Sequence, residues 1–220
     1  MPAEIVSLLQ SDPATERIQV NQGEPEKKIA FDGAGGEPRN ADVALLGSDS
    51  SGQVVAITIE AKADEPFGDT FEQTVAKSVE RLVSGKRSNG VRRAEELACA
   101  LLPPRRLRKR VPPSESTPSL GPLRYQLFTA VAGTLAFAHQ SRAHLAVFIV
   151  YEFVTDCTED EKHKANALDF DAFVTRLSDG AIRKVRSGEL VGPIRVAENN
   201  NWPSKPVLYI GKATKDIRTR

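Results

Sequence analysis

Cysteine is scarce in this chain, which contains only two among 220 residues, Cys99 and Cys157. Neither lies in a CxxC pair and no histidine pair stands at zinc-finger spacing, so neither a disulfide framework nor a structural zinc site is expected. No apolar run approaches the ~20 residues that span a bilayer. The first residues also lack the basic and apolar regions of a signal peptide. We therefore expect a cytoplasmic protein without a membrane partner.

An excess of charge of either sign is also missing. The chain has 30 Lys and Arg against 29 Asp and Glu, for a formal net charge of +1, so the overall balance predicts no partner. No internal repeat is visible, which excludes solenoids and propellers. A chain of this length can bury one sizeable core and does not require two. We expect a single domain over residues 1–220.

Alternating and continuous apolar segments predict the secondary structure. The expected strands cover residues 28–31, 42–47, 54–62, 144–153 and 206–211. Helical patterns occur near residues 5–9, 71–83, 91–101, 124–140 and 168–177, with Pro122 expected as the first residue of the fourth helix. Gly133 within that helix indicates close packing against a sheet. The Pro- and Ser-rich residues 103–121 predict an exposed loop. This order predicts an α/β fold, a mixed β-sheet flanked by helices.

Two opposite charges stand at the end of the strand over residues 54–62. With the side-chain period of 2, Glu60 and Lys62 point to the same face. If the preceding hairpin is centred on Ser51, Asp42 of the neighbouring strand lies directly opposite Glu60, with their Cβ atoms ~5 Å apart. A slip of one residue would move Asp42 to the other face. The pattern therefore predicts a cluster of Asp42, Glu60 and Lys62.

Two facing carboxylates repel each other unless a positive charge lies between them. Mg²⁺, or Mn²⁺ in its place, prefers such oxygen ligands, and the backbone carbonyl of Ala61 is a third candidate ligand. A bound metal activates water and stabilises charge on a phosphoryl oxygen, and Lys62 could orient or deprotonate that water. The alternative is a salt-bridge cluster of the same three side chains at the margin of the sheet.

The combination of Asp42, a strand and turn, and Glu60-Ala61-Lys62 resembles the PD-(D/E)XK motif of restriction-endonuclease-like nucleases. The segments EAKADEPFG, RYQLFTAVAGTLA and HLAVFIVYEF resemble a little-characterised bacterial family usually placed in that superfamily. The resemblance implies a restriction-endonuclease-like core and a metal-dependent nuclease, with DNA as the expected substrate and bacterial defence or DNA repair as the setting. Ala41 stands where the motif has proline.

The resemblance also implies a role for each motif residue. Asp42 and Glu60 would bind the metal, and Lys62 would be the catalytic lysine. Some branches of the superfamily use a Gln on the helix after the motif, for which Gln126 is the candidate. Others use an acidic residue on the N-terminal helix, and the sequence leaves three candidates open: Glu4, Glu16 and Glu24.

A dense basic run follows the third predicted helix, with Arg92 and Arg93 upstream of it. Its residues are Arg105, Arg106, Arg108, Lys109 and Arg110, and they suit contacts to nucleic-acid phosphates as well as a solvated loop. The segment Asp32-Gly33-Ala34-Gly35-Gly36 matches no phosphate-loop spacing and predicts a turn. The alternative function is an inactive nucleic-acid-binding or protein-interaction module on the same fold. The oligomeric state stays open, a homodimer included.

Overall fold

The computed structural model describes the chain except for residues 34, 103–116, 197–201, 203–205 and 220. Its helices are α1 (Ala3–Leu9), α2 (Phe71–Val83), α3 (Gly90–Leu101), α4 (Tyr125–Gln140) and α5 (Asp160–Leu177). Its strands are β1 (Gln19–Ile29), β2 (Arg39–Ser48), β3 (Val54–Lys62), β4 (Leu145–Val154), β5 (Glu189–Ile194) and β6 (Val207–Asp216). The predicted basic run, residues 105–110, lies outside the described residues.

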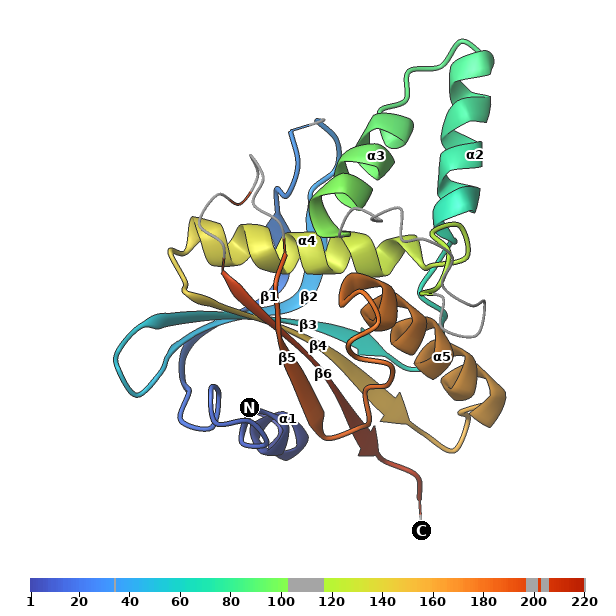
Figure 1. Cartoon of the computed structure of the whole chain (residues 1–220). Coiled ribbons are helices and arrows are strands. Elements are labelled where there is room, and N and C mark those ends of the chain that lie inside the picture. The colour runs from blue at the N-terminus through green and yellow to red at the C-terminus, as the bar shows by residue number, and fades with distance from the viewer. Residues whose placement is uncertain (34, 103–116, 197–201, 203–205, 220) are drawn as a thin grey trace.

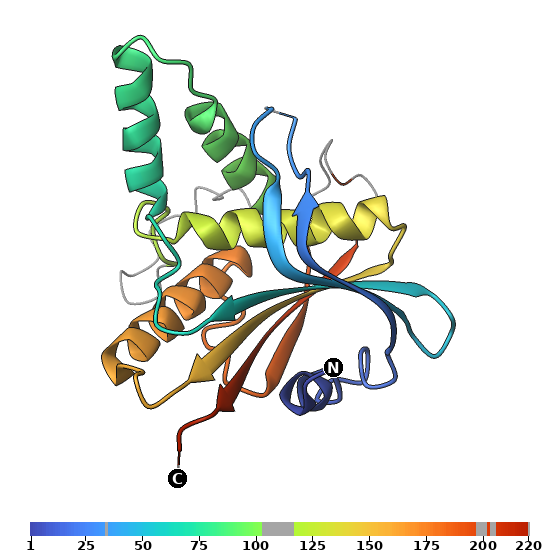
Figure 2. The ribbon, with the colours of Figure 1, turned by 180° about the vertical axis from the view of Figure 1, so that it is seen from behind.

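The strands form one mixed sheet in the order β1-β2-β3-β4-β6-β5. β1, β2 and β3 pair antiparallel, β3, β4 and β6 pair parallel, and β5 pairs antiparallel with β6. Helices α4 and α5 cover one face, while α1 lies on the other (Figures 1 and 2). Parallel strands need long crossover connections, and the segment that contains α2, α3 and α4 links β3 to β4.

Alternate side chains of β3 pack in two hydrophobic cores, one on each side of the sheet. Ile57 and Ile59 pack in the smaller core with Ile5 and Leu8 of α1. Ala56 packs in the larger core with residues of α3, α4 and α5. The faces of β3 thus follow the predicted period of 2, which places Glu60 and Lys62 on the side covered by α4.

The α/β class and the mixed sheet flanked by helices are confirmed, and β3 covers the predicted residues. Several boundaries were wrong. β1 begins at Gln19 rather than at residue 28, because it is an edge strand whose exposed residues need no apolar pattern. β6 continues to Asp216, and α4 begins at Tyr125, three residues after Pro122. The sequence did not predict β5, whose Gly192 and Pro193 are unfavourable in strands.

No helix within the described part of the chain is both long enough and apolar enough to cross a membrane.

Candidate active site

The candidate residues meet where β2 and β3 separate, beneath the first turn of α4. The ladder pairs Leu46 with Ala56 and Ala44 with Thr58, in the predicted register. The described pairing ends at Val43 and Ile59, and beyond it the Asp42 carboxylate accepts the backbone N–H of Ala61 at 2.7 Å. Asp42 therefore satisfies the end of β3 with its side chain, where a strand backbone would otherwise pair.

β2 is irregular at Asp42, which changes the expected geometry. Ala41 and Ala44 both contact the core under α4, although a strict period of 2 would place them on opposite faces. The irregularity coincides with Glu26 of β1, which has φ of 50° and lies at the position where the β1–β2 pairing skips a pair. In consequence Arg39, rather than the carboxylate of Asp42, meets Glu60.

Glu60 is the centre of the cluster, with only 3% of its surface exposed. Its Oε2 atom forms an ion pair with the guanidinium of Arg39. Its Oε1 atom accepts from Nε2 of Gln126 at 2.6 Å and lies 3.1 Å from Nζ of Lys62. A buried carboxylate needs such compensation, and here two cations and one amide supply it.

Arg39 is built into the site by the packing of α4. A Cβ atom added at Gly133 would lie 3.1 Å from Cγ of Arg39, so the bare backbone at residue 133 leaves room for the arginine stem. The cavity between them has a volume of about 10 Å³. Burial lowers the pKa of Arg39, and the nearby Asp42 opposes this shift. Its ordinary pKa lies so far above neutrality that the guanidinium remains charged.

Lys62 is as buried as its partner, with 4% of its surface exposed. Its Nζ atom also lies 3.7 Å from Oε1 of Glu65 and 5.4 Å from the centre of the Phe67 ring. Burial lowers the pKa of Lys62, and Arg39 adds to that shift, while the charges of Glu65 and Asp42 oppose it. A lysine with a lowered pKa is a better proton acceptor near neutral pH.

The lowered pKa of Lys62 predicts its titration in the metal-free protein. Lys62 should lose its proton at a lower pH than an ordinary lysine, whereas Lys162, whose pKa is raised by Glu159, should lose its proton later. Nuclear magnetic resonance of labelled lysine side chains in EDTA measures both. At a pH between the pKa of Lys62 in the folded chain and its pKa in the unfolded chain, the unfolded chain binds more protons. The contribution of Lys62 to the free energy of unfolding should therefore rise with pH in that range. Titration of the two lysines at the same pH would contradict the conclusion that burial lowers the pKa of Lys62.

The charged end of the sheet continues across the parallel strands. Lys62 lies opposite Glu152 of β4, and Oε2 of Glu152 lies 3.4 Å from Nζ of Lys212 on β6. All three side chains are buried. No sequence pattern indicated Glu152 and Lys212, because no short motif joins residues so far apart. Charges of alternating sign therefore compensate one another along this row.

The acidic candidates of the N-terminal region do not join Glu60. Glu4 of α1 accepts from the Tyr151 hydroxyl at 3.0 Å, on the face opposite Glu60, since Tyr151 packs in the smaller core. Its hydrogen bonds, to the backbone and to Tyr151, lower the pKa of Glu4. Glu16 pairs with Arg17 and Glu24 with Lys27. Within the described residues, the site therefore lacks a carboxylate from α1.

The donor chemistry suits Mg²⁺ with one restriction. Asp42 and Glu60 offer hard oxygen ligands, and the Ala61 carbonyl points to the same edge of β3 as its N–H, as in any strand. Among the described residues, no third His, Cys, Asp or Glu joins a metal-ligating group. Both oxygens of Glu60 already bind cations or an amide. A metal ligated by Glu60 would therefore compete with Arg39.

A model of a known protein family matches residues 1–217, and so includes every residue of this site. The chain belongs to that family, a domain of unknown function (DUF6946). No curated protein and no solved structure matches the chain.

Within this family member, Arg39 is the direct partner of Glu60 that the sequence did not indicate. A strict period of 2 counted back from Ala44 puts Arg39 on the face away from Glu60. The only local signal is that Arg39 lies three residues before Asp42, at the start of a strand, where charged residues are common. Its role became visible only through Glu60 and Gly133, which are distant in the sequence.

Proposed function

We propose that this protein is a Mg²⁺-dependent nuclease of the PD-(D/E)XK type, which hydrolyses phosphodiester bonds in nucleic acid, with DNA as the expected substrate. One observation carries the proposal. Gln126, predicted for this role only through the resemblance, donates to Glu60 at 2.6 Å, next to Lys62 on the same carboxylate and beside Asp42. Motif residues from β2, β3 and α4 thus meet at one place.

Each side chain has a distinct role in this proposal. Asp42, Glu60 and the Ala61 carbonyl would hold Mg²⁺, which when bound activates water and stabilises charge on a phosphoryl oxygen. In its unprotonated form, Nζ of Lys62 accepts the proton of the attacking water, whose oxygen bonds to phosphorus as the bond to the leaving oxygen breaks, and the leaving oxygen takes up a proton from solvent. Gln126 fixes the orientation of Glu60. Arg39 supplies a positive charge beside the carboxylates. The strength of its ion pair with Glu60 determines how readily the Glu60 carboxylate becomes available to the metal.

Cleavage by the wild-type protein tests the proposal directly. Plasmid, linear duplex and single-stranded DNA, together with RNA, should be tested with Mg²⁺, Mn²⁺ and EDTA. We expect cleavage with either metal and none in EDTA. Calorimetry should detect binding of Mn²⁺ to the wild type and weaker binding to Asp42→Asn. Failure to cleave any of these substrates with either metal would contradict the nuclease function.

The second candidate is an inactive nucleic-acid-binding module, and the Arg39–Glu60 ion pair favours it. A site whose carboxylate is already compensated by Arg39 and Lys62 does not need a metal for stability. This candidate predicts nucleic-acid binding that is unchanged by EDTA, with no product at any metal concentration. Binding and cleavage measured on the same preparation therefore separate the two candidates.

The proposed setting is the cytoplasm, with a role in bacterial defence or DNA repair. Cys99 and Cys157 are free thiols, as is usual in a reducing compartment. The basic run from Arg105 to Arg110 is proposed to contact phosphates, although it lies outside the described residues. Phosphate contacts of that kind position a nucleic acid and carry no sequence information.

A further inference from the structure

Helices α2 and α3 project together from the layered body of the protein (Figures 1 and 2). The apolar stripe of α2 is buried only at its base, where Phe71 is 7% exposed. Further along the same helix, Val79 is 43% exposed and Val83 is 84% exposed. We refer to residues 71–101 as the helical arm. Burial in the hydrophobic core therefore does not explain why the distal half of α2 extends along this arm.

A cleft with a volume of about 370 Å³ lies along the arm. Its lining consists of Asp69 and the polar face of α2, the loop into α3, Arg93 of α3, and the glycines of the β1–β2 connection. The α2 face consists of Thr74, Lys77, Ser78 and Arg81, whose spacing of three and four residues places them on one side of a helix. The cleft is therefore lined by polar and charged side chains.

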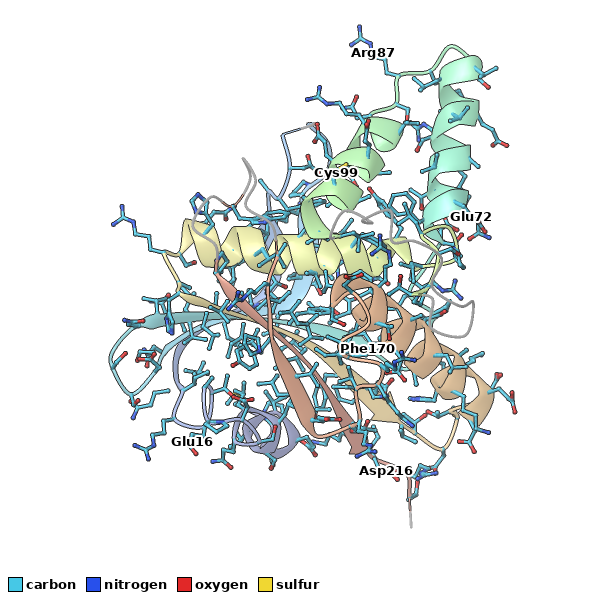
Figure 3. The ribbon with its side chains drawn as sticks, in the orientation of Figure 1. Glu16, Glu72, Arg87, Cys99, Phe170 and Asp216 are labelled. Atoms are coloured by element: carbon cyan, nitrogen blue, oxygen red, sulfur yellow. The ribbon has the colours of Figure 1, made fainter. Side chains whose placement is uncertain are left out.

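The charge of the cleft is strongly positive. Residues 81–93 contain five Lys and Arg and no Asp or Glu. Among the described residues, the lining contains the cations Lys77, Arg81, Arg87 and Arg93 and one carboxylate, that of Asp69. Lys77 pairs with Asp69 at 2.5 Å, and Arg93 pairs with Asp32. Neither Arg81 nor Arg87 forms an ion pair within the described residues, and the side chain of Arg87 extends outward from the loop between α2 and α3 (Figure 3).

The walls of the cleft are held in place by contacts that involve neither of these two arginines, as far as the described part of the chain shows. Arg93 lies over the Phe31 ring at 4.5 Å and donates to the Glu37 carbonyl at 2.6 Å. The side-chain amide of Asn89 donates to the Gly35 carbonyl, which ties the β1–β2 connection to the start of α3. A Cβ added at Gly90 would lie 2.0 Å from Oγ of Ser78, so the two helices approach closely there. The cleft is thus shaped before any ligand arrives.

The base of the cleft adjoins the candidate active site. The backbone carbonyl of Asp69, a lining residue, accepts the N–H of Tyr125 at 3.0 Å. The next residue is Gln126, whose side chain binds Glu60. A chain of phosphates that lies along α2 would therefore lead toward Glu60 and Lys62.

We propose that this cleft binds the phosphate backbone of nucleic acid, with Arg81 and Arg87 as the contacting cations. The proposal rests on the proposed function for its choice of ligand and names a binding surface for the same substrate. An anionic backbone would compensate two arginines that form no ion pair with any described residue, and it would release counterions as it binds. Such contacts orient the substrate without reading its bases.

The test is the salt dependence of binding to a labelled duplex of mixed sequence, measured by fluorescence anisotropy in EDTA so that cleavage does not interfere. For Arg81→Ser/Arg87→Ser, the slope of log K against log salt should become shallower by about 2, or roughly one unit for each lost phosphate contact. The matched control, Arg17→Ser/Arg142→Ser, removes the same charge from two exposed arginines that lie outside both the helical arm and the cleft lining. The slope for this control should differ from the wild-type slope by less than half of the change expected for the cleft variant.

Each outcome decides the proposal. Equal slopes for the two double variants, or a wild type that binds no nucleic acid, would overturn it. An affinity lost with the cleft variant but kept with the control supports it, whether or not the protein cleaves. If the wild type binds through the cleft but never cleaves, the nuclease function fails and the cleft stands. If it cleaves and both variants bind alike, the cleft fails and the nuclease function stands.

Discussion

Lys62→Ala should cleave nucleic acid at least ~10²-fold more slowly than the wild type, the scale typical of a positioned proton acceptor. The substitution should leave the fold intact, because Glu60 keeps its ion pair with Arg39 and its hydrogen bond from Gln126. It also removes no metal ligand. A time course of plasmid nicking, a thermal melt and Mn²⁺ calorimetry on the same variant measure the three properties separately.

Lys162→Ala is the matched control for this variant. Lys162 is an exposed lysine paired with Glu159 at 2.8 Å, and its loss should leave the cleavage rate unchanged. A stable Lys62→Ala protein that cleaves at the wild-type rate would remove Lys62 from the mechanism. A variant that melts much earlier and loses cleavage only in proportion to its folded fraction would give Lys62 a structural role instead.

Glu60→Gln should lower the free energy of unfolding by about 3 kcal/mol, the lower end of the cost of breaking a buried ion pair. The substitution keeps the volume of the side chain but removes the one carboxylate that pairs with both Arg39 and Lys62. Arg39→Met removes one of those cations. The double variant Glu60→Gln/Arg39→Met should therefore be more stable than the sum of the single changes predicts, by at least about 1 kcal/mol.

Urea unfolding of the four proteins of this cycle measures the coupling. The exposed pair of Glu159 and Lys162 provides the control, since Glu159→Gln should change the free energy of unfolding by no more than ~0.5 kcal/mol. Additive effects of Glu60→Gln and Arg39→Met would mean that the two side chains do not interact in solution. In that case the Glu60 carboxylate would be available to a metal without competition from Arg39.

The local sequence was sufficient where a segment is regular and where its pattern is strong. The boundaries of β3 followed from its apolar run, its register with β2 followed from a hairpin centred on Ser51, and the common face of Glu60 and Lys62 followed from the period of 2. α4 was equally readable, and close packing at Gly133 was expected. Strands with exposed faces, such as β1, carry no apolar pattern to find, and β5 contains two residues that disfavour strands.

The sequence by itself thus determined the α/β class, the strand that carries Glu60 and Lys62, and the residues most worth testing. Only the tertiary structure decided that Arg39 is the second cation paired with Glu60. That choice depends on the irregularity of β2 opposite Glu26, on the space above Gly133, and on the first turn of α4, which brings Gln126 to the carboxylate. These contacts join residues from separate parts of the chain. The period of 2 along one strand cannot predict these contacts, because one irregular residue exchanges the two faces of the strand.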